Sequence, residues 1–237
     1  MDENELAIST YNKIARRYAD SYSGDARDMP YVDQFLSRLS IGAKILDVGC
    51  GPGVLVRYIS NKGYQCEGID LSEEMIKIAH EKVPQGKFSL MDMRHLQYAD
   101  EAFDGIVAVY ALIHIPSVEI SSTLGEFGRV LKKDGLLLII AQQGEKDHIV
   151  NEPLGNGEKT FINFFTPERL SQALADTGLT VVVQERNETT DAHALTKSNT
   201  VIYTIARKEH ESAGFKKSRA KPPAHTGTGK EWVVSSL

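Results

Sequence analysis

The sequence is poor in cysteine and has no long apolar stretch. Its two cysteines, Cys50 and Cys66, have a spacing that fits neither a disulfide framework nor a zinc site. Reduced thiols in a cytoplasmic protein are therefore expected. The longest apolar run, 106–113, is far shorter than the ~20 residues that a membrane-spanning helix needs. That run predicts no membrane span. The acidic amino terminus lacks the basic and apolar regions of a signal peptide, so we expect that it is not one.

An excess of positive charge is also missing. The 237 residues include 27 Lys and Arg against 32 Asp and Glu, for a net charge of −5. Such a chain has no overall basic field to hold a phosphate backbone, so nucleic acid is not an expected partner. The apolar share of 41% is ordinary for a folded protein with a core.

Apolar positions at helical spacing predict two helices near the amino terminus, over 8–18 and 32–39. Further along, short apolar runs alternate with helical patterns. Strands are expected at 45–49, 65–70, 87–91, 103–110, 136–141, 179–185 and 200–206.

This alternation predicts an α/β fold with a doubly wound, mainly parallel seven-stranded sheet and helices on both faces, because parallel neighbours need a crossover. The last two strands have no helix between them, so one antiparallel strand is expected near the carboxyl end. We expect one domain over 1–207, with a helical cap at 1–41 and a core at 42–207. Residues 208–237 lack periodicity and predict a disordered tail.

A glycine-rich turn follows the first strand, with the sequence Asp-Val-Gly-Cys-Gly-Pro-Gly over 47–53. Ligands of open parallel sheets bind at such turns, where glycine lets the backbone approach closely. The dinucleotide pattern needs glycine at 54, where Val54 stands, and a P-loop ending is absent. Asp47 would repel a pyrophosphate and suits a cationic ligand. A nicotinamide dehydrogenase is therefore disfavoured.

Asp70 ends the second strand, 21 residues after Gly49. An acid about 20 residues past the first glycine bonds ribose hydroxyls in such folds, and one carboxylate can accept from two neighbouring hydroxyls. The alternative is that Asp70 has no ligand and only precedes the next helix. Together with the glycine turn, Asp70 favours a ligand with a ribose and a positive charge.

The turn at 47–53, the segment Gly-Ile-Asp-Leu-Ser-Glu-Glu-Met over 68–75, and the segments 103–110 and 128–136 together resemble the class I S-adenosylmethionine-dependent methyltransferases. The chain is most similar to the small-molecule enzymes of the ubiquinone and menaquinone biosynthesis type, over about 8–207. The resemblance implies a Rossmann-like fold, S-adenosylmethionine as cofactor, and methyl transfer to a small-molecule acceptor by in-line displacement. The alternative is a non-catalytic module that binds the same cofactor.

The resemblance also implies site residues. Asp47 would hold the methionine amino group, Asp70 the ribose hydroxyls and Asp92 the adenine amino group. The two methionines of the set could equally be core residues, since methionine commonly fills gaps. The cofactor-binding residues implied are Tyr18, Asp47, Gly49, Cys50, Gly51, Gly53, Asp70, Leu71, Met75, Asp92, Met93, Val109 and Tyr110.

His114 is the candidate catalytic base, because a neutral imidazole titrates in the useful range. Alternatively, His114 has a structural role, in which it forms a hydrogen bond with the backbone or positions the next helix. The segment 142–165 and Tyr110 are expected to shape an apolar or aromatic acceptor pocket, although Phe161, Phe164 and Phe165 could be core.

The Asn/Asp-Pro-Pro-Tyr/Phe signature of enzymes that methylate amino groups of nucleic acids is absent after the fourth strand, where Tyr-Ala-Leu-Ile stands at 110–113. This favours a small acceptor over DNA. No metal is implied, and a monomer or homodimer is expected.

Overall fold

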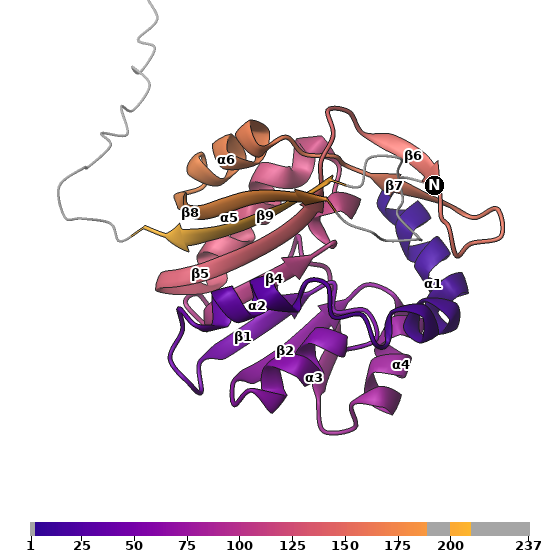
Figure 1. Ribbon diagram of the computed structural model, residues 1–237, viewed down its shortest axis with the longest axis horizontal. Coiled ribbons are helices and arrows are strands. Elements are labelled where there is room, and N and C mark those ends of the chain that lie inside the picture. Colours follow the sequence, from indigo (N-terminus) through magenta and orange to yellow (C-terminus); the bar gives the residue numbers. More distant parts are fainter. Residues whose placement is uncertain (1–2, 189–199, 210–237) are drawn as a thin grey trace, which may run out of the picture.

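The computed structural model describes residues 3–188 and 200–209, and it contains a seven-stranded sheet in the order β3-β2-β1-β4-β5-β9-β8 (Figure 1). Its strands are β1 (Lys44–Val48), β2 (Gln65–Asp70), β3 (Lys87–Leu90), β4 (Phe103–Val109), β5 (Leu131–Gln142), β8 (Leu179–Glu188) and β9 (Thr200–Lys208). β9 is antiparallel to both neighbours, and the other pairs are parallel. The predicted mainly parallel sheet with one antiparallel strand is therefore confirmed.

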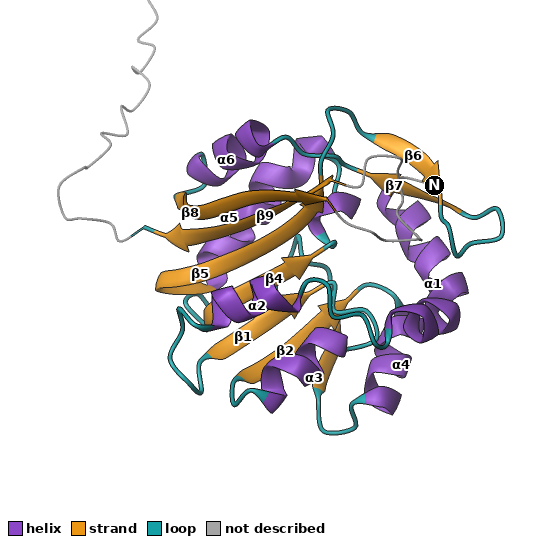
Figure 2. Ribbon diagram, in the orientation of Figure 1, coloured by secondary structure: helices purple, strands orange, loops and turns teal. Residues whose placement is uncertain are grey.

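Helices pack on both faces of the sheet (Figure 2). Side chains of α2 and α3 join a core cluster on one face, and those of α5 and α6 join the cluster on the other. The described helices are α1 (Glu3–Tyr22), α2 (Met29–Leu36), α3 (Val54–Asn61), α4 (Glu73–Lys82), α5 (Ile120–Val130) and α6 (Pro167–Ala175). Ser72 caps α4 and Thr166 caps α6, because their side-chain oxygens accept from the backbone N–H groups of Met75 and Arg169.

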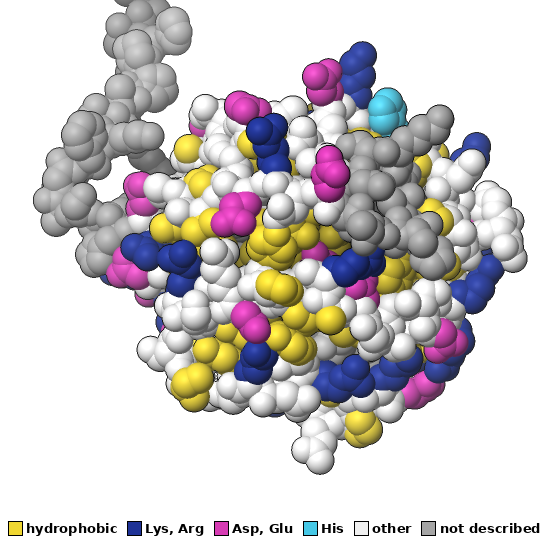
Figure 3. Space-filling model, viewed as in Figure 1, with side chains coloured by type: hydrophobic (Ala, Val, Ile, Leu, Met, Phe, Trp, Pro, Cys, Tyr) yellow, Lys and Arg dark blue, Asp and Glu magenta, His cyan; other side chains and the backbone are white. Residues whose placement is uncertain are grey.

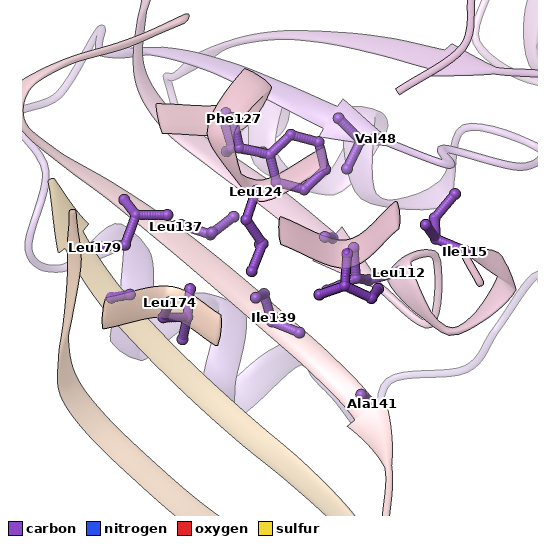
Figure 4. Close-up of a cluster of buried hydrophobic side chains, with 14 of the residues drawn as sticks. Val48, Leu112, Ile115, Leu124, Phe127, Leu137, Ile139, Ala141, Leu174 and Leu179 are labelled. Atoms are coloured by element: carbon purple, nitrogen blue, oxygen red, sulfur yellow. The ribbon is translucent and has the colours of Figure 1, made fainter. Parts of the chain in front are cut away.

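Each strand at the centre divides its apolar side chains between the two faces. In β5, Leu137 and Ile139 face α5 and α6, where they pack with Phe127 (Figure 4). Leu138 and Ile140 belong to the opposite cluster. This alternation follows from the two-residue period of a strand, and burial on both faces explains the continuous apolar run. On the face shown in Figure 3, hydrophobic side chains lie over α2, β5 and β9, with charges of both signs around them.

Segment 142–165, in which no strand was predicted, lies between β5 and α6. It contains a separate two-stranded antiparallel sheet of β6 (His148–Asn151) and β7 (Lys159–Ile162). Each strand has only four residues, and the β6 pattern is mostly exposed, so it carries no apolar alternation that a sequence would display. Two short 3₁₀ turns, Leu112–His114 and Ser117–Glu119, follow β4.

The predicted tail falls almost wholly outside the described residues. Of 208–237, the structure describes Lys208, which ends β9, and Glu209. The two amino-terminal helices differ in their bounds from the predicted 8–18 and 32–39, because α1 extends from Glu3 to Tyr22 and α2 begins at Met29, with Pro30 in its first turn.

Helix α1 crosses the carboxyl edge of the sheet, from α4 to the β6–β7 hairpin (Figure 1). Toward α4, the Ser72 hydroxyl donates to Asn12 Oδ1 at 2.7 Å. Toward the hairpin, the Thr10 hydroxyl donates to the Lys159 carbonyl at 2.6 Å, and Thr10 is 1% exposed. These buried bonds hold α1 over the edge at which the strands of an open sheet bind ligands.

Replacing Ser72 by alanine should lower the free energy of unfolding by about 1–2 kcal/mol. The change removes the cap on Met75 N–H and the bond to Asn12. The measurement is the urea midpoint of the full chain. Ser60→Ala, on the exposed last turn of α3, is the control and should stay within about 0.5 kcal/mol of wild type. Equal midpoints for the two variants would contradict the bridging role of Ser72.

Candidate functional site

A cavity of about 250 Å³ opens at the carboxyl ends of β1, β2 and β4, beside α1. The strand order reverses between β1 and β4, so the cavity lies at the topological switch point of the sheet. The predicted residues that line it are Tyr18, Asp47, Gly49, Cys50, Gly51, Asp70, Leu71, Met75, Met93, Val109, Tyr110 and His114.

Gly53 and Asp92 are not part of the cavity wall. Gly53 has φ +80° at the start of α3, and a Cβ there would lie 2.8 Å from the Phe88 ring. It closes the turn and permits close packing. Partial burial of Asp92 tends to raise its pKa. Hydrogen bonds from Arg94 have the larger effect and hold the Asp92 pKa below its usual value. The contacts that the resemblance implied for these two residues stay predictions.

Two carboxylates meet at the floor of the cavity, at the ends of β1 and β2. Asp70 accepts from the backbone N–H groups of Gly51 at 2.9 Å and Ser72 at 2.8 Å. These bonds hold one of its oxygens at the glycine turn and the other at the start of α4. Burial raises the Asp70 pKa in spite of them.

Asp47 is 1% exposed, and its Oδ2 has no hydrogen-bond partner among the described residues. Burial, with the nearby charge of Asp70 adding to it, raises the Asp47 pKa to about 8. A buried carboxylate without a partner is costly, and a cation in the cavity would offset that cost. The pair of acids therefore forms a site for a positively charged ligand.

Three tyrosines of α1 line the cavity: Tyr11, Tyr18 and Tyr22. The Tyr11 and Tyr18 rings are 5.8 Å apart edge to face, and the Tyr18 and Tyr22 rings are 4.6 Å apart. Their spacing along the helix places them on one stripe. They provide an aromatic wall opposite the carboxylates.

Tyr110 follows β4 with φ +53°, a backbone conformation that bulky residues rarely adopt. Its hydroxyl donates to Asp28 Oδ1 at 3.3 Å, and the Tyr203 hydroxyl donates to the same oxygen at 2.9 Å. Burial raises the Asp28 pKa, and the tyrosine hydrogen bonds only partly offset it. Asp28 thus connects the segment before α2 to β4 and β9 at the cavity wall. The sequence analysis did not find Asp28, because an acidic residue before a helix is common at helix starts and indicates no binding site.

His114 lies in the first 3₁₀ turn, and its Nδ1 is 3.0 Å from the Phe161 carbonyl oxygen. A carbonyl can only accept, so Nδ1 carries the proton and Nε2 keeps its lone pair. Burial lowers the His114 pKa to about 4, although the bond to Phe161 opposes this shift. The imidazole is therefore neutral near pH 7. The backbone bond proposed as the alternative is present, and the base role stays a prediction.

The three phenylalanines expected near the acceptor are buried in the core and do not line the cavity. Phe161, Phe164 and Phe165 thus follow the core alternative. Asn4 and Glu152, which the sequence reasoning missed, line the cavity instead. They are 8% and 6% exposed, respectively. A polar residue at an amino terminus and one in a hairpin turn give no local signal of burial.

The methyltransferase-domain family model matches residues 45–135. Methyltransferase GfsG of Streptomyces halstedii is 34% identical over 128 residues, which cover 49% of this chain and 45% of that protein. The ubiquinone/menaquinone biosynthesis C-methyltransferase UbiE of Campylobacter jejuni is 28% identical, over 59% of this chain and 65% of that protein. Residues 45–135 are therefore similar to a methyltransferase domain. The predicted resemblance to the class I family is confirmed.

The matches span about half the length of the curated relatives. A solved S-adenosylmethionine-dependent methyltransferase structure from Methanosarcina mazei superposes with a TM-score of 0.69 at 22% identity, covering 77% of this chain and 98% of that one. At this identity, the superposition establishes the fold of the methyltransferase domain. It also extends the likeness beyond residues 45–135, to most of the described chain.

The free energy of unfolding should fall by at most about 3 kcal/mol as the pH decreases from 6.5 to 4, because of His114. The unfolded imidazole takes a proton near pH 6.5 and the folded one only near 4, so the unfolded state binds more protons in this window and stability drops with falling pH.

The measurement is urea unfolding at several pH values. His114→Asn, whose amide can still donate to the Phe161 carbonyl, should show a shallower decrease. His148→Asn, at an exposed position in β6, is the control and should keep the wild-type slope. An unchanged slope in His114→Asn would contradict a buried, neutral His114.

Proposed function

We propose that the chain is an S-adenosylmethionine-dependent methyltransferase that acts on a small-molecule acceptor. The single observation that carries this proposal is the buried Oδ2 of Asp47, which lies beside Asp70 in the cavity at the switch point and has no hydrogen-bond partner in the described part of the chain. The alternative ligand, a dinucleotide, would bring a pyrophosphate against these carboxylates.

The residues present fit the cofactor. Asp47 offers a carboxylate to the donor's amino group. Asp70 still has lone pairs for ribose hydroxyls, because each oxygen can accept more than one hydrogen bond. Gly49 and Gly51 have φ values of +71° and +50°, which let the turn pass close to a ligand without side chains in the way.

When bound, this cofactor supplies an electrophilic methyl group on a cationic sulfur, with a neutral sulfide as leaving group. The protein then has to align the acceptor and exclude water, and orientation can lower the barrier by about 7–11 kcal/mol. Helix α1 supports the exclusion of water, because buried bonds hold it at both sides of the cavity. We propose that His114 accepts a hydrogen bond from the acceptor rather than a full proton, since its low pKa makes it a weak base.

A non-catalytic module that binds the same cofactor is the second candidate. The polar lining beyond the predicted cofactor residues, namely Asn4 and Glu152, favours the enzyme, because it provides groups for an acceptor. Among the described residues, no helix is long and apolar enough to cross a membrane. The cytoplasmic location, the lack of nucleic-acid binding and the monomeric or dimeric state stay predictions.

S-adenosylhomocysteine should bind the full chain in calorimetry, and Asp70→Asn should weaken the binding at least tenfold. The asparagine loses charge-assisted acceptors for the ribose hydroxyls, and its amide faces the backbone N–H groups that Asp70 now accepts from. Asp176→Asn, on the exposed end of α6, is the matched control and should bind as wild type.

Binding of NADH in preference to S-adenosylhomocysteine would contradict the proposed cofactor. Formation of S-adenosylhomocysteine from S-adenosylmethionine in the presence of an acceptor distinguishes the enzyme from the binding module.

A further inference from the structure

We infer that the acceptor of this chain is a small amine, which binds through its N–H groups between α1, His114 and Glu152. This inference rests on the proposed methyl transfer and specifies the class of acceptor. It is carried by the kind of polar atoms that the structure brings to this part of the cavity.

Three segments that are distant in sequence meet here. Asn4 and Tyr11 are seven residues apart on α1, so they share one helical stripe. The Tyr11 ring lies 5.0 Å from the His114 ring, edge to face. Glu152 follows β6, and it is close enough to Tyr11 that its charge adds to the rise of the Tyr11 pKa that burial causes.

The backbone of the hairpin turn holds Glu152 at this place. Its N–H donates to the Glu158 carbonyl at 2.9 Å, and its carbonyl accepts from Gly155 N–H at 2.8 Å. One side-chain oxygen also accepts from Leu154 N–H at 3.3 Å. With 6% exposure, the carboxylate belongs to the cavity wall rather than to the surface.

The polar atoms here are mostly hydrogen-bond acceptors. Nε2 of the neutral His114 accepts, because Nδ1 holds the proton. The Glu152 carboxylate also accepts. Tyr11 can donate one hydrogen bond, and Asn4 can do both. A complementary ligand is rich in donors, and an ammonium group has three donors and no acceptor. A carboxylate or phosphate acceptor would meet acceptor atoms and leave them unpaired.

The charges along the cavity favour the same ligand. Its described lining has one basic residue, Arg27, whose guanidinium pairs with Asp25. The acidic lining residues besides Asp25 and the largely protonated Asp47 are Asp28, Asp70 and Glu152, so negative charge exceeds positive charge along the cavity. Low-dielectric walls with charges of one sign attract ligands of the other sign and repel like-charged ones. A hydroxyl acceptor would also need a strong base, which His114 is not.

The step balances without a further reactant. An amine arrives mostly as ammonium, and one proton leaves its nitrogen to bulk water before the cavity encloses it. The remaining N–H groups of the neutral amine donate to the acceptor atoms. The nitrogen lone pair then forms a bond to the methyl carbon, the bond from that carbon to sulfur breaks, and its electron pair stays on the sulfur. A primary amine thus becomes a secondary methylammonium, which can lose a proton to water on release.

The test compares three probes of similar shape: 2-phenylethylamine, 2-phenylethanol and 3-phenylpropionate. Their binding to the full chain is measured by calorimetry, with and without saturating S-adenosylhomocysteine. We expect the amine to bind at least tenfold more tightly than the other two. Glu152→Gln should reduce this preference about tenfold, because the amide keeps the shape but loses the charge. It should change the affinity for S-adenosylhomocysteine less than twofold.

Glu158→Gln is the matched control, since Glu158 lies on the same hairpin and pairs with Lys13 on the outside of α1. It should keep the wild-type preference. An amine that binds no better than the alcohol, or no binding of any probe at millimolar concentration, would overturn the inference. An equal loss in both variants would do so as well.

The comparison of probes on the unmodified chain decides the question even if Glu152→Gln does not fold. Lack of binding by S-adenosylhomocysteine would overturn the proposed function. Lack of amine preference in a chain that binds S-adenosylhomocysteine would overturn only this inference.

Discussion

The site depends on the burial of two acidic side chains at adjacent strand ends. Asp47 and Asp70 end up together because β1 and β2 are parallel neighbours, with Asp47 in register with Gly68 and the two strands ending at the same edge. Asp70 is held by backbone N–H groups of the turn and of α4, whereas one oxygen of Asp47 is left without a partner among the described residues. A fold optimised for stability alone would avoid this arrangement. A cationic ligand bound beside Asp47 would offset the cost of burying this oxygen without a partner.

Helix α1 covers the strand ends that the open sheet leaves exposed. An open sheet exposes the ends of its strands, so a ligand bound there is in contact with water on one side. The helix covers this side, and two of its polar residues bond to different parts of the structure: the half-buried Asn12 to the start of α4 and the buried Thr10 to the hairpin strand β7. Its tyrosines then form an aromatic wall opposite the acids. The same helix therefore contributes to stability and to the shape of the cavity.

The β6–β7 hairpin has a comparable double role. It packs against α1, and it brings Glu152 to the side of the cavity where His114 lies. His114 is in turn anchored to this hairpin through the Phe161 carbonyl. The part of the cavity that would receive an acceptor is thus built from segments outside the parallel core. In such folds, the parallel core can stay constant while added segments change the chemistry that the site accepts.

Much of the fold and of the cofactor side of the cavity follows from local sequence. Apolar runs and the glycine turn act over a few residues, so the alternation of strands and helices, the mainly parallel sheet and the positions of Asp47 and Asp70 after the first and second strands are visible in the chain alone. The acceptor side is different. Asn4, Asp28 and Glu152 are polar residues in unremarkable local contexts, and their burial depends on packing between distant segments. The His114 tautomer likewise depends on a carbonyl 47 residues away, and the low basicity of the ring depends on its burial. Only the tertiary structure decides such features, because desolvation and long-range hydrogen bonds leave no periodic signal in the sequence.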